Sequence, residues 1–161
     1  MQRMLQTRPL GPDDQVSLWR WLHIALWDPP PAPLRPPDVL DSPQVRIYAE
    51  DWGRPGDVGV VGVVEHTDVG ACWMRRLPAG VGLASIDEHT PQLGIALLPE
   101  FQHRGFGRPL MLAALQAARE VGYRRVSLTV HPQNPAIHLY LRCGFITQGT
   151  RGTYLLMIAE L

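Results

Sequence analysis

The chain has 161 residues, of which 45% are hydrophobic and 19% charged, and its fifteen basic side chains match its fifteen acidic ones in number. This length and composition are typical of one globular domain with a sizeable core, so we expect residues 1–161 to form a single domain. The balance of charge argues against a broad nucleic-acid-binding surface.

The cysteines and the apolar runs limit the environment of the protein. Cys72 and Cys143 are too few for a disulfide scaffold and lack metal-ligand spacing, so we expect two reduced thiols and no bound metal ion. The N-terminal segment MQRMLQTRPL has no apolar core of the signal-peptide type, and no run reaches about 18 apolar residues. These features predict a cytoplasmic protein with neither a membrane nor a nucleic acid as partner.

The first quarter of the sequence predicts a strand and a helix. Residues 2–8 have the pattern of a short strand. Residues 11–27, GPDDQVSLWRWLHIALW, follow with acidic side chains in the first turn and apolar side chains at helical spacing. The order is therefore strand, then helix.

A proline-rich connector, DPPPAPLRPP at residues 28–37, cannot continue that helix and leads to a second helix around residues 43–52. Within it Pro30, Pro33 and Arg35 match a P-x-x-P-x-R pattern that aromatic-lined peptide-binding domains recognise. The alternative is a stiff loop inside the domain, which needs no partner.

The remainder of the chain predicts strands and two further helices. The GRPGD turn precedes two strand runs, VGVVGVVEH and VGACWMRRL, joined at Thr67 and Asp68 as a hairpin. In chain order there follow a loop, a strand at 91–98, a helix ending near Gly122, a strand at 124–130, a helix at 134–144, and strands at 145–148 and 153–159. The order β-α-α-β-β-β-α-β-α-β-β predicts an α/β (α+β) domain, a single mixed sheet with helices on both faces.

The segment LPEFQHRGFGRPLM, residues 98–111, places a Q-x-x-G-x-G pattern at the start of a helix. The first turn of a helix leaves about four backbone NH groups without partners and carries the positive end of the helix dipole. Glycine lets a ligand approach this backbone closely, so Gln102, Gly105 and Gly107 indicate a site for a phosphate or diphosphate. His103, Arg104 and Arg108 add positive charge around the same loop.

Pro109 is compatible with this arrangement, because proline is tolerated in the first turn of a helix. The NH groups of residues 105–108 then remain free to face a ligand. An ordinary strand-to-helix loop is the alternative for a lone G-x-G. A dinucleotide fingerprint would require glycine at position 110, where the chain has Leu110.

The element order, with LLPEFQHRGFG and, some 30 residues later, NPAIHLYLRCGF, resembles the GNAT superfamily of acyl-CoA-dependent N-acetyltransferases. The resemblance covers nearly the whole chain and is strongest from Pro91 to Ile146. It implies the GNAT fold, with a single mixed and mostly antiparallel sheet of about six to seven strands and helices on both faces. It also implies acetyl-CoA as the acyl donor.

The resemblance further implies where coenzyme A binds. The loop from Gln102 to Gly107 would hold the diphosphate, the backbone of Ile95, Ala96 and Leu97 would pair with the pantetheine arm like an added strand, and Asn134 and Tyr140 would flank the thioester. The full set of expected cofactor-binding residues is Ile95, Ala96, Leu97, Gln102, His103, Arg104, Gly105, Phe106, Gly107, Arg108, Asn134 and Tyr140.

Acetyl transfer to an amine needs a neutral nucleophile, stabilisation of the oxyanion and a proton for the departing thiolate. The resemblance implies that Tyr140 donates this proton and that a backbone NH near residues 95–97 serves the carbonyl oxygen. The alternative for Tyr140 is a half-buried aromatic residue that packs on the sheet. For a lysine-like amine of pKa about 10.4, deprotonation at pH 7 costs about 4.6 kcal/mol, so a base or a water chain is expected.

The sequence offers several candidates for the base. Family members with a related P-E-L-G-I run often begin the strand with glutamate, whereas this chain has Gln92, which cannot ionise. Glu88 is our first choice for a base that acts through water, with Asp87 and His89 as neighbours in the same loop, although surface solvation is the alternative for each. His131 and His138 are further titratable candidates without an assigned role.

Two functions follow from these patterns. The first is an acetyl-CoA-dependent N-acetyltransferase acting on a primary amine of a small molecule or peptide, with Tyr140 and Glu88 as catalytic residues. The second is a catalytically weak acyl-CoA sensor or interaction module, which Gln92 in place of a carboxylate would favour. The exposed strand edges of such a fold would allow a homodimer, and the acceptor is expected to be shaped by the first two helices, the loop at 77–90 and the last hairpin.

Overall fold

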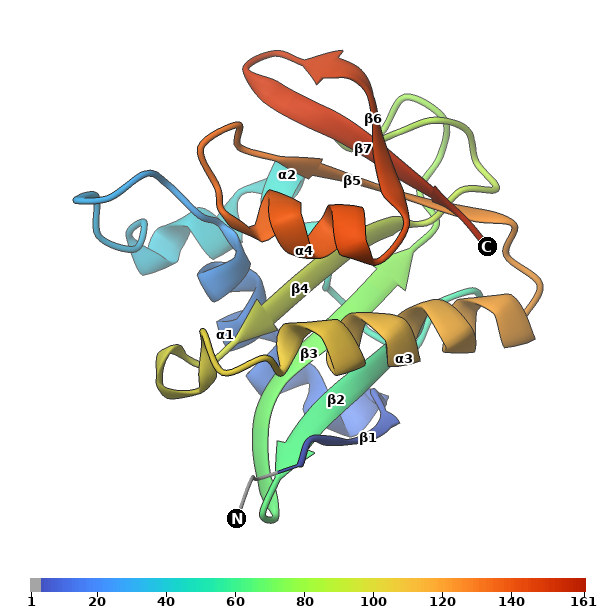
Figure 1. Cartoon of the computed structure of the whole chain (residues 1–161). Helices are drawn as coiled ribbons and strands as arrows, with labels where there is room; N and C mark the ends of the chain where they lie inside the picture. Colours follow the sequence, from blue (N-terminus) through green and yellow to red (C-terminus); the bar gives the residue numbers. More distant parts are fainter. Residues whose placement is uncertain (1–3) are drawn as a thin grey trace.

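Within residues 4–161, which a computed structural model describes, seven strands form one mixed sheet (Figure 1). The strands are β1 (Gln6–Pro9), β2 (Val58–Val64), β3 (Thr67–Arg75), β4 (Gln92–Leu97), β5 (Arg125–Val130), β6 (Phe145–Arg151) and β7 (Tyr154–Glu160). Their order across the sheet is β1-β2-β3-β4-β5-β7-β6, and all neighbours are antiparallel except the parallel pair β4 and β5. The expected mixed, mostly antiparallel sheet is confirmed.

Helices cover both faces of this sheet, as the sequence predicts (Figure 1). They are α1 (Gln15–Ala25), α2 (Pro43–Arg46), α3 (Gly107–Glu120) and α4 (Ala136–Arg142). The core on one face contains Leu110, Met111 and Leu115 of α3, and the core on the other contains Leu18, Trp21 and Leu22 of α1. Among the described residues, no helix has the length and apolar character needed to cross a membrane.

The sheet opens between β4 and β5. Within the described chain, these two strands pair only at Gln92 and Ser127, where the amide of Ser127 donates 3.1 Å to the carbonyl of Pro91. Beyond this point the two strands diverge (Figure 1). The separation leaves backbone groups of β4 without a strand partner.

Several boundaries differ from the sequence prediction, among them that of β6, which extends to Arg151 and not only to residue 148. The first hairpin turns at Glu65 and His66, which have φ of +48° and +69°, and β3 already begins at Thr67. The expected turn at Thr67 and Asp68 is therefore wrong by two residues. Left-handed backbone at both positions is the requirement of a type I′ two-residue hairpin turn, whereas the β-branched Thr67 suits the strand. The first strand, expected at 2–8, is described from Gln6 to Pro9, and residues 2 and 3 lie outside the described part.

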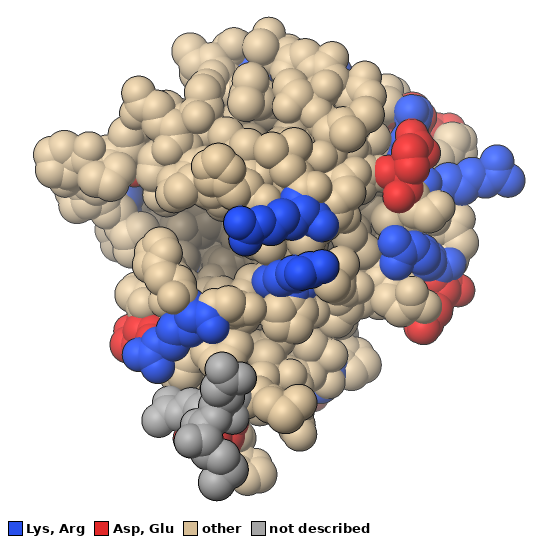
Figure 2. All heavy atoms as spheres, viewed as in Figure 1, with Lys and Arg blue, Asp and Glu red and all other residues tan. Residues whose placement is uncertain are grey.

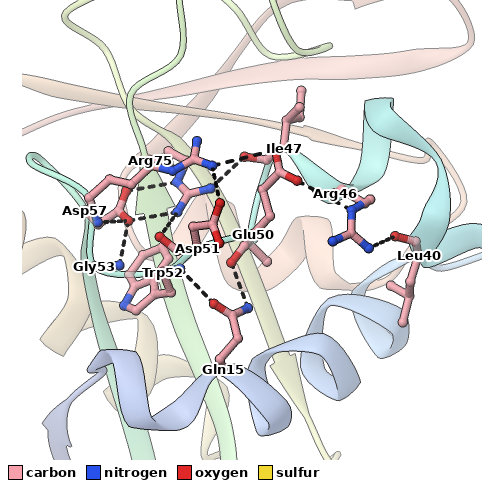
Figure 3. A network of polar contacts seen from close by, with 12 residues as sticks. Gln15, Leu40, Arg46, Ile47, Glu50, Asp51, Trp52, Gly53, Asp57 and Arg75 are labelled. Carbon is pink, nitrogen blue, oxygen red and sulfur yellow. Dashed lines mark hydrogen bonds and ion pairs between the residues drawn. The ribbon is translucent and has the colours of Figure 1, made fainter.

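The second helix, expected at 43–52, ends as an α-helix at Arg46 and continues as turns. The amides of Tyr48 and Ala49 donate to carbonyls three residues earlier, those of Val45 and Arg46, so the regular α-helical ladder has ended there. The buried guanidinium of Arg75 donates to the carbonyl oxygens of Ile47 at 3.0 Å and Asp51 at 3.5 Å in the turns that follow (Figure 3). Asp51 has φ of +50°, a left-handed conformation that ends the helical path.

The same Arg75 fixes the segment after α2 to the sheet. Its guanidinium forms a two-pronged ion pair with Asp57, with both bonds 2.9 Å long, and the side chains are 2% and 3% exposed. Asp57 also accepts the amides of Gly53 and Arg54, and the guanidinium lies 5.4 Å from the ring of Trp52. Figure 3 shows this network joining α1, the segment after α2 and β3.

Candidate active site

A cavity of about 730 Å³ lies where β4 and β5 separate. Its floor comes from residues 92–95 of β4 and 128–130 of β5. Its walls come from the end of α1, from α2, from the loop at 80–84, and from Tyr154 in the last hairpin. The structure thus brings together the segments that the sequence analysis expected to shape the acceptor site.

Tyr140 lies on α4 and lines this cavity while being only 8% exposed. Its ring packs against Phe145 at 6.0 Å between centroids, and within the described chain its hydroxyl has no hydrogen-bond partner. Burial raises the pKa of the Tyr140 phenol well above its usual range. The phenol therefore stays protonated at neutral pH and is able to donate its proton to a group in the cavity.

The open edge of β4 presents alternate backbone groups. Leu98 donates its amide to Val69 of the strand before, and the carbonyl of Pro91 accepts from β5 on the opposite side. Because these directions alternate along a strand, the backbone groups of Ile95 and Leu97 face the gap beyond the pairing of Gln92 and Ser127. The backbone groups of Ala96 are directed toward β3. Of the three residues expected to pair with the pantetheine arm, Ala96 is therefore the one whose NH and carbonyl face a neighbouring strand.

Gln102 has a role inside the protein. Its side-chain amide donates 2.8 Å to the carbonyl of Leu97, which lies on the open edge of β4. This bond holds the loop at 102–106 against the end of that strand. His103 and Gly105 have φ of +62° and +83°, so the loop turns through two left-handed positions before α3 begins.

The backbone amides at the start of α3 are unpaired. Within the described residues, the NH groups of 103–106 have no acceptor, and those of Gly107 and Arg108 lie at the first two helical positions, where no preceding turn supplies one. Pro109 takes the third helical position, as expected. A Cβ added at Gly105 would meet nothing within 4 Å, so its surroundings are open.

Phe106 and Gly107 position this loop against the rest of the fold. Phe106 is buried with Val64 and Val69, so its side chain anchors the loop and is directed into the protein. A Cβ on Gly107 would lie 3.0 Å from a methyl carbon of Leu139, the neighbour of Tyr140. The absence of a side chain there allows α3 and α4 to approach each other closely.

Basic side chains gather at this end of the molecule. Figure 2 shows them over the space between α3 and α4, beside a hollow in the surface. Arg104 lies 5.8 Å from the ring of Phe101, and Arg108 is close enough to Cys143 to affect that thiol electrostatically. His103, Arg104 and Arg108 are exposed, so their charge is available to an anion at the unpaired amides.

Asn134 lines the cavity from the turn that precedes α4. Its side-chain oxygen accepts a 2.9 Å hydrogen bond from the backbone NH of Ala136, and its backbone NH donates to the carbonyl of His131 at 2.9 Å. These bonds fix the turn, and the side-chain NH₂ of Asn134 remains able to donate. His131 also lines the cavity, where its ring lies 5.6 Å from Trp27 and 6.0 Å from Tyr154.

Gln92 has a structural role that sequence reasoning missed. Its buried side chain donates 2.8 Å to the carbonyl of Val81 and accepts 3.2 Å bonds from the hydroxyl of Tyr48 and the amide of Ala84. Tyr48 in turn accepts the amide of Leu83. A carboxylate could not donate to Val81, so glutamine is the side chain that this loop requires. The strand alternation, which puts Gln92 on the face of Gly94 and Ala96, was the available signal.

Glu88 lies away from the cavity. Its side chain is 68% exposed and contacts His89 at 3.5 Å, and neither residue is part of the lining. Asp87 pairs with Arg125 at 2.6 Å and accepts the hydroxyl of Thr90 at 2.9 Å. His138 is exposed on α4 and does not line the cavity either. The structure therefore does not bring Glu88 together with Tyr140, and its role as base remains a prediction.

Comparison with known sequences identifies similar proteins. The family model described as Acetyltransferase (GNAT) family matches residues 17–145. A streptothricin acetyltransferase from Streptomyces lavendulae is 34% identical over 112 residues, which cover 65% of this chain and 58% of the relative. A spermidine N(1)-acetyltransferase from Vibrio cholerae is 26% identical over 69% of this chain and 54% of its own length. The matches thus span little more than half of these two relatives.

Solved structures show the same fold. PaiA, an N-acetyltransferase from Thermoplasma acidophilum solved in complex with coenzyme A, superposes with a TM-score of 0.67 at 16% identity and covers 98% of this chain and 99% of that one. The GNAT domain of a protein named PAT from S. lividans gives a TM-score of 0.69 at 18% identity, covering 98% and 90%. At these identities the similarity concerns the fold.

Proposed function

This chain belongs to the acetyltransferase (GNAT) family, and we propose that it transfers an acetyl group from acetyl-CoA to a primary amine of a small molecule or a peptide. The observation that carries the proposal is the alignment of three features around one opening in the sheet. These are the unpaired amides before α3, the open backbone edge of β4, and the protonated hydroxyl of Tyr140. Together they match the three parts of an acyl thioester of coenzyme A.

The loop before α3 fits a diphosphate. Its free amides, the dipole of a 14-residue helix and the exposed His103, Arg104 and Arg108 all favour negative charge. Gly105 leaves open space in front of this backbone. Phe106 and Gln102 support the proposal indirectly, because one anchors the loop and the other ties it to Leu97. The Thermoplasma protein, solved with coenzyme A, has the same fold.

The open edge of β4 fits the pantetheine arm, which carries amide groups able to pair as an added strand does. Ile95 and Leu97 direct their backbone groups into the gap, although Gln102 already occupies the carbonyl of Leu97. The free amide of Ile95 is our candidate for stabilising the negative charge that develops on the acetyl oxygen. Asn134 would flank the arm from the opposite side.

In the proposed reaction the neutral acceptor nitrogen attacks the acetyl carbonyl carbon directly, the carbon–sulfur bond breaks, and the leaving sulfur takes a proton from Tyr140. The acceptor nitrogen loses one proton, which can pass to solvent and restore Tyr140. Burial keeps this phenol in the acid form that the step needs. Since Glu88 lies outside the cavity, a water-mediated route is the one we favour.

The decisive experiment measures acetyl-CoA binding by calorimetry with Gly105→Glu and a matched control, Gly122→Glu. Both glycines have positive φ, +83° and +95°, and both face open space, but Gly122 follows the far end of α3. Backbone strain is therefore similar, and only the first variant puts bulk and negative charge beside the free amides. We expect Gly105→Glu to abolish binding and Gly122→Glu to retain it. Undiminished binding by Gly105→Glu would refute this placement.

A second function, a catalytically weak acyl-CoA sensor, is favoured by one observation. Gln92 stands where family members often have a glutamate base, and its side chain is engaged in holding the loop at 81–84. A panel of amines with thiol release as the readout separates the two functions. Turnover that depends on Tyr140 supports the enzyme, whereas binding of acetyl-CoA without turnover of any amine supports the sensor.

A further inference from the structure

The cavity lacks negative charge. Of its lining residues, all within the described part of the chain, none is aspartate or glutamate. The single arginine of the lining, Arg35, is neutralised by Asp28 through two bonds of 2.9 and 3.0 Å. A polyamine or a lysine side chain would therefore leave its positive charge without an anionic partner in this cavity, which costs free energy when the site is desolvated.

Carboxylates on the segments that adjoin α2 and the loop at 80–84 are engaged in ion pairs. Glu50 pairs with Arg46 at 3.4 Å and with Arg54 at 3.6 Å, and Asp41 pairs with Arg46 at 3.8 Å. Asp87 pairs with Arg125, and Asp57 is held by Arg75. Reorientation of any of these into the cavity would break an existing ion pair, and for Asp57 it would leave Arg75 buried without its partner.

The walls that remain are apolar and aromatic. Leu26, Trp27 and Val45 line the side formed by the first two helices, and Trp73 lies beneath them in the sheet. Tyr48 and Tyr154 add aromatic faces, while the hydroxyl of Tyr48 is engaged by Gln92 and Leu83. Such walls bury an apolar body well and offer few polar groups to a hydrophilic chain.

We infer that the acceptor is an apolar or aromatic monoamine whose amino group is weakly basic, such as the α-amino group of an apolar amino-acid amide or peptide. The inference rests on the proposed acetyl transfer and names its substrate class. At pH 7 an α-amino group of pKa about 7.7 is neutral in about one molecule in six, whereas a lysine-like amine of pKa about 10.4 is neutral in about one in 2,500. Without a carboxylate in the cavity to assist deprotonation, that difference decides which amines react.

The inference separates this chain from what the names of two relatives indicate. The Vibrio protein is named for spermidine, a cationic polyamine, and the Streptomyces protein for streptothricin. The lining described here offers no anionic group to a polyamine. We therefore include spermidine as a probe, and we expect it to be a poor acceptor.

The test compares L-phenylalaninamide with phenethylamine, which carry the same phenyl ring on amines of different basicity, and adds spermidine and lysinamide as cationic probes. We expect the kcat/KM of phenylalaninamide at pH 7 to exceed that of phenethylamine at least tenfold, and the ratio to approach one as the pH rises to 9.5. This convergence identifies basicity, and not the carboxamide, as the cause. The chain contains fifteen Arg and no Lys, so its own side chains do not compete as acceptors.

A charge variant tests the lining itself. Val45→Glu places a carboxylate in the wall, and Val45→Gln is the control of equal size without charge. We expect the ratio of kcat/KM for spermidine over phenylalaninamide to rise at least tenfold in Val45→Glu and to change less than threefold in Val45→Gln. Because the ratio is measured within one preparation, partial loss of folded protein does not affect it.

The outcomes distinguish the two levels of the proposal. If acetyl-CoA does not bind, the proposed function itself fails. If acetyl-CoA binds but spermidine or lysinamide reacts as well as phenylalaninamide, or neither phenyl amine reacts at all, the inferred substrate class is wrong while the assignment of the cofactor site stands.

Discussion

The side-chain amide of Gln92 donates a 2.8 Å hydrogen bond to the carbonyl oxygen of Val81 and thereby ties the loop at 80–84 to the first residue of β4. The oxygen of the same amide accepts from Tyr48 and Ala84. One side chain thus fixes three segments that line the cavity. The position where family members often carry a glutamate is occupied in this chain by a side chain that organises the wall of the cavity.

Gln92→Glu should therefore impair the protein and not supply it with a base. The carboxylate cannot donate to Val81, so two acceptor oxygens would face each other in a buried setting, at a cost of about 1–3 kcal/mol in the free energy of unfolding. Urea denaturation measures this cost, with Gln92→Met as the control that removes all three bonds without adding charge. A Gln92→Glu protein that is as stable as the parent and faster in turnover would contradict this role.

Tyr140→Phe should lower kcat by about 100-fold, since general acid catalysis typically contributes 10² to 10⁴ in rate. Affinity for acetyl-CoA and stability should change little, because the hydroxyl has no hydrogen-bond partner among the described residues. The matched control is Tyr123→Phe, which removes a 2.5 Å bond to the carbonyl of Gly56. That variant should lose about 1 kcal/mol of stability and keep its kcat. Equal losses of kcat and cofactor affinity in Tyr140→Phe would argue against proton donation.

Asp57→Ala should destabilise the protein by about 3–5 kcal/mol, because it leaves the buried guanidinium of Arg75 without its counter-charge. The amides of Gly53 and Arg54 lose an acceptor as well. Thermal unfolding measures the loss. The double variant Asp57→Leu with Arg75→Met removes both charges and should be more stable than Asp57→Ala alone. If the double variant were the less stable of the two, an unpaired charge would not be the cause.

The sequence predicted the parts of the fold that depend on local pattern. Gly122 and the apolar spacing located the end of α3, and alternation in RRVSLTV located β5. The expected order of elements and the loop at 102–108 before a helix are both present. These features are encoded within a few residues of where they act, so a single sequence suffices to find them.

Features that depend on distant partners were not predictable in this way. The turns after α2 are held by Arg75, which lies 28 residues after Ile47 and donates to its carbonyl. The function of Gln92 reflects Tyr48 and the loop at 81–84, which the chain brings together only in the folded sheet. Glu88 looked suitable as a base from its place in the loop, but in the folded protein its side chain is 68% exposed, contacts His89 and is not part of the cavity lining.

The loop that carries Glu88 should respond to acid through Asp87. The ion pair and hydrogen bond from Arg125 lower the pKa of Asp87 from its usual 3.8 to about 2, with the hydroxyl of Thr90 contributing next. Since the folded-state pKa is depressed, the stabilisation is fully present above pH 3.8 and is lost as the pH falls toward 2. Asp87→Asn should therefore flatten the fall in stability between pH 4 and 2, measured by urea unfolding at each pH.

Glu88→Gln is the control for this prediction. Glu88 is the residue next to Asp87, its carboxylate is 68% exposed, and in the described chain it contacts only the exposed His89. We expect its acid profile to follow that of the parent, since this exposed side chain forms no contact with Arg125 or Thr90, the two partners of Asp87. The same protein, assayed with the best amine at pH 8, tests Glu88 as a base. If Glu88→Gln lowers kcat while its acid profile is unchanged, Glu88 acts as a base through water. If kcat is unchanged, solvent in the cavity takes the proton of the amine.

An Asp87→Asn profile as steep as that of the parent would show that Arg125 does not depress the pKa of Asp87 in solution.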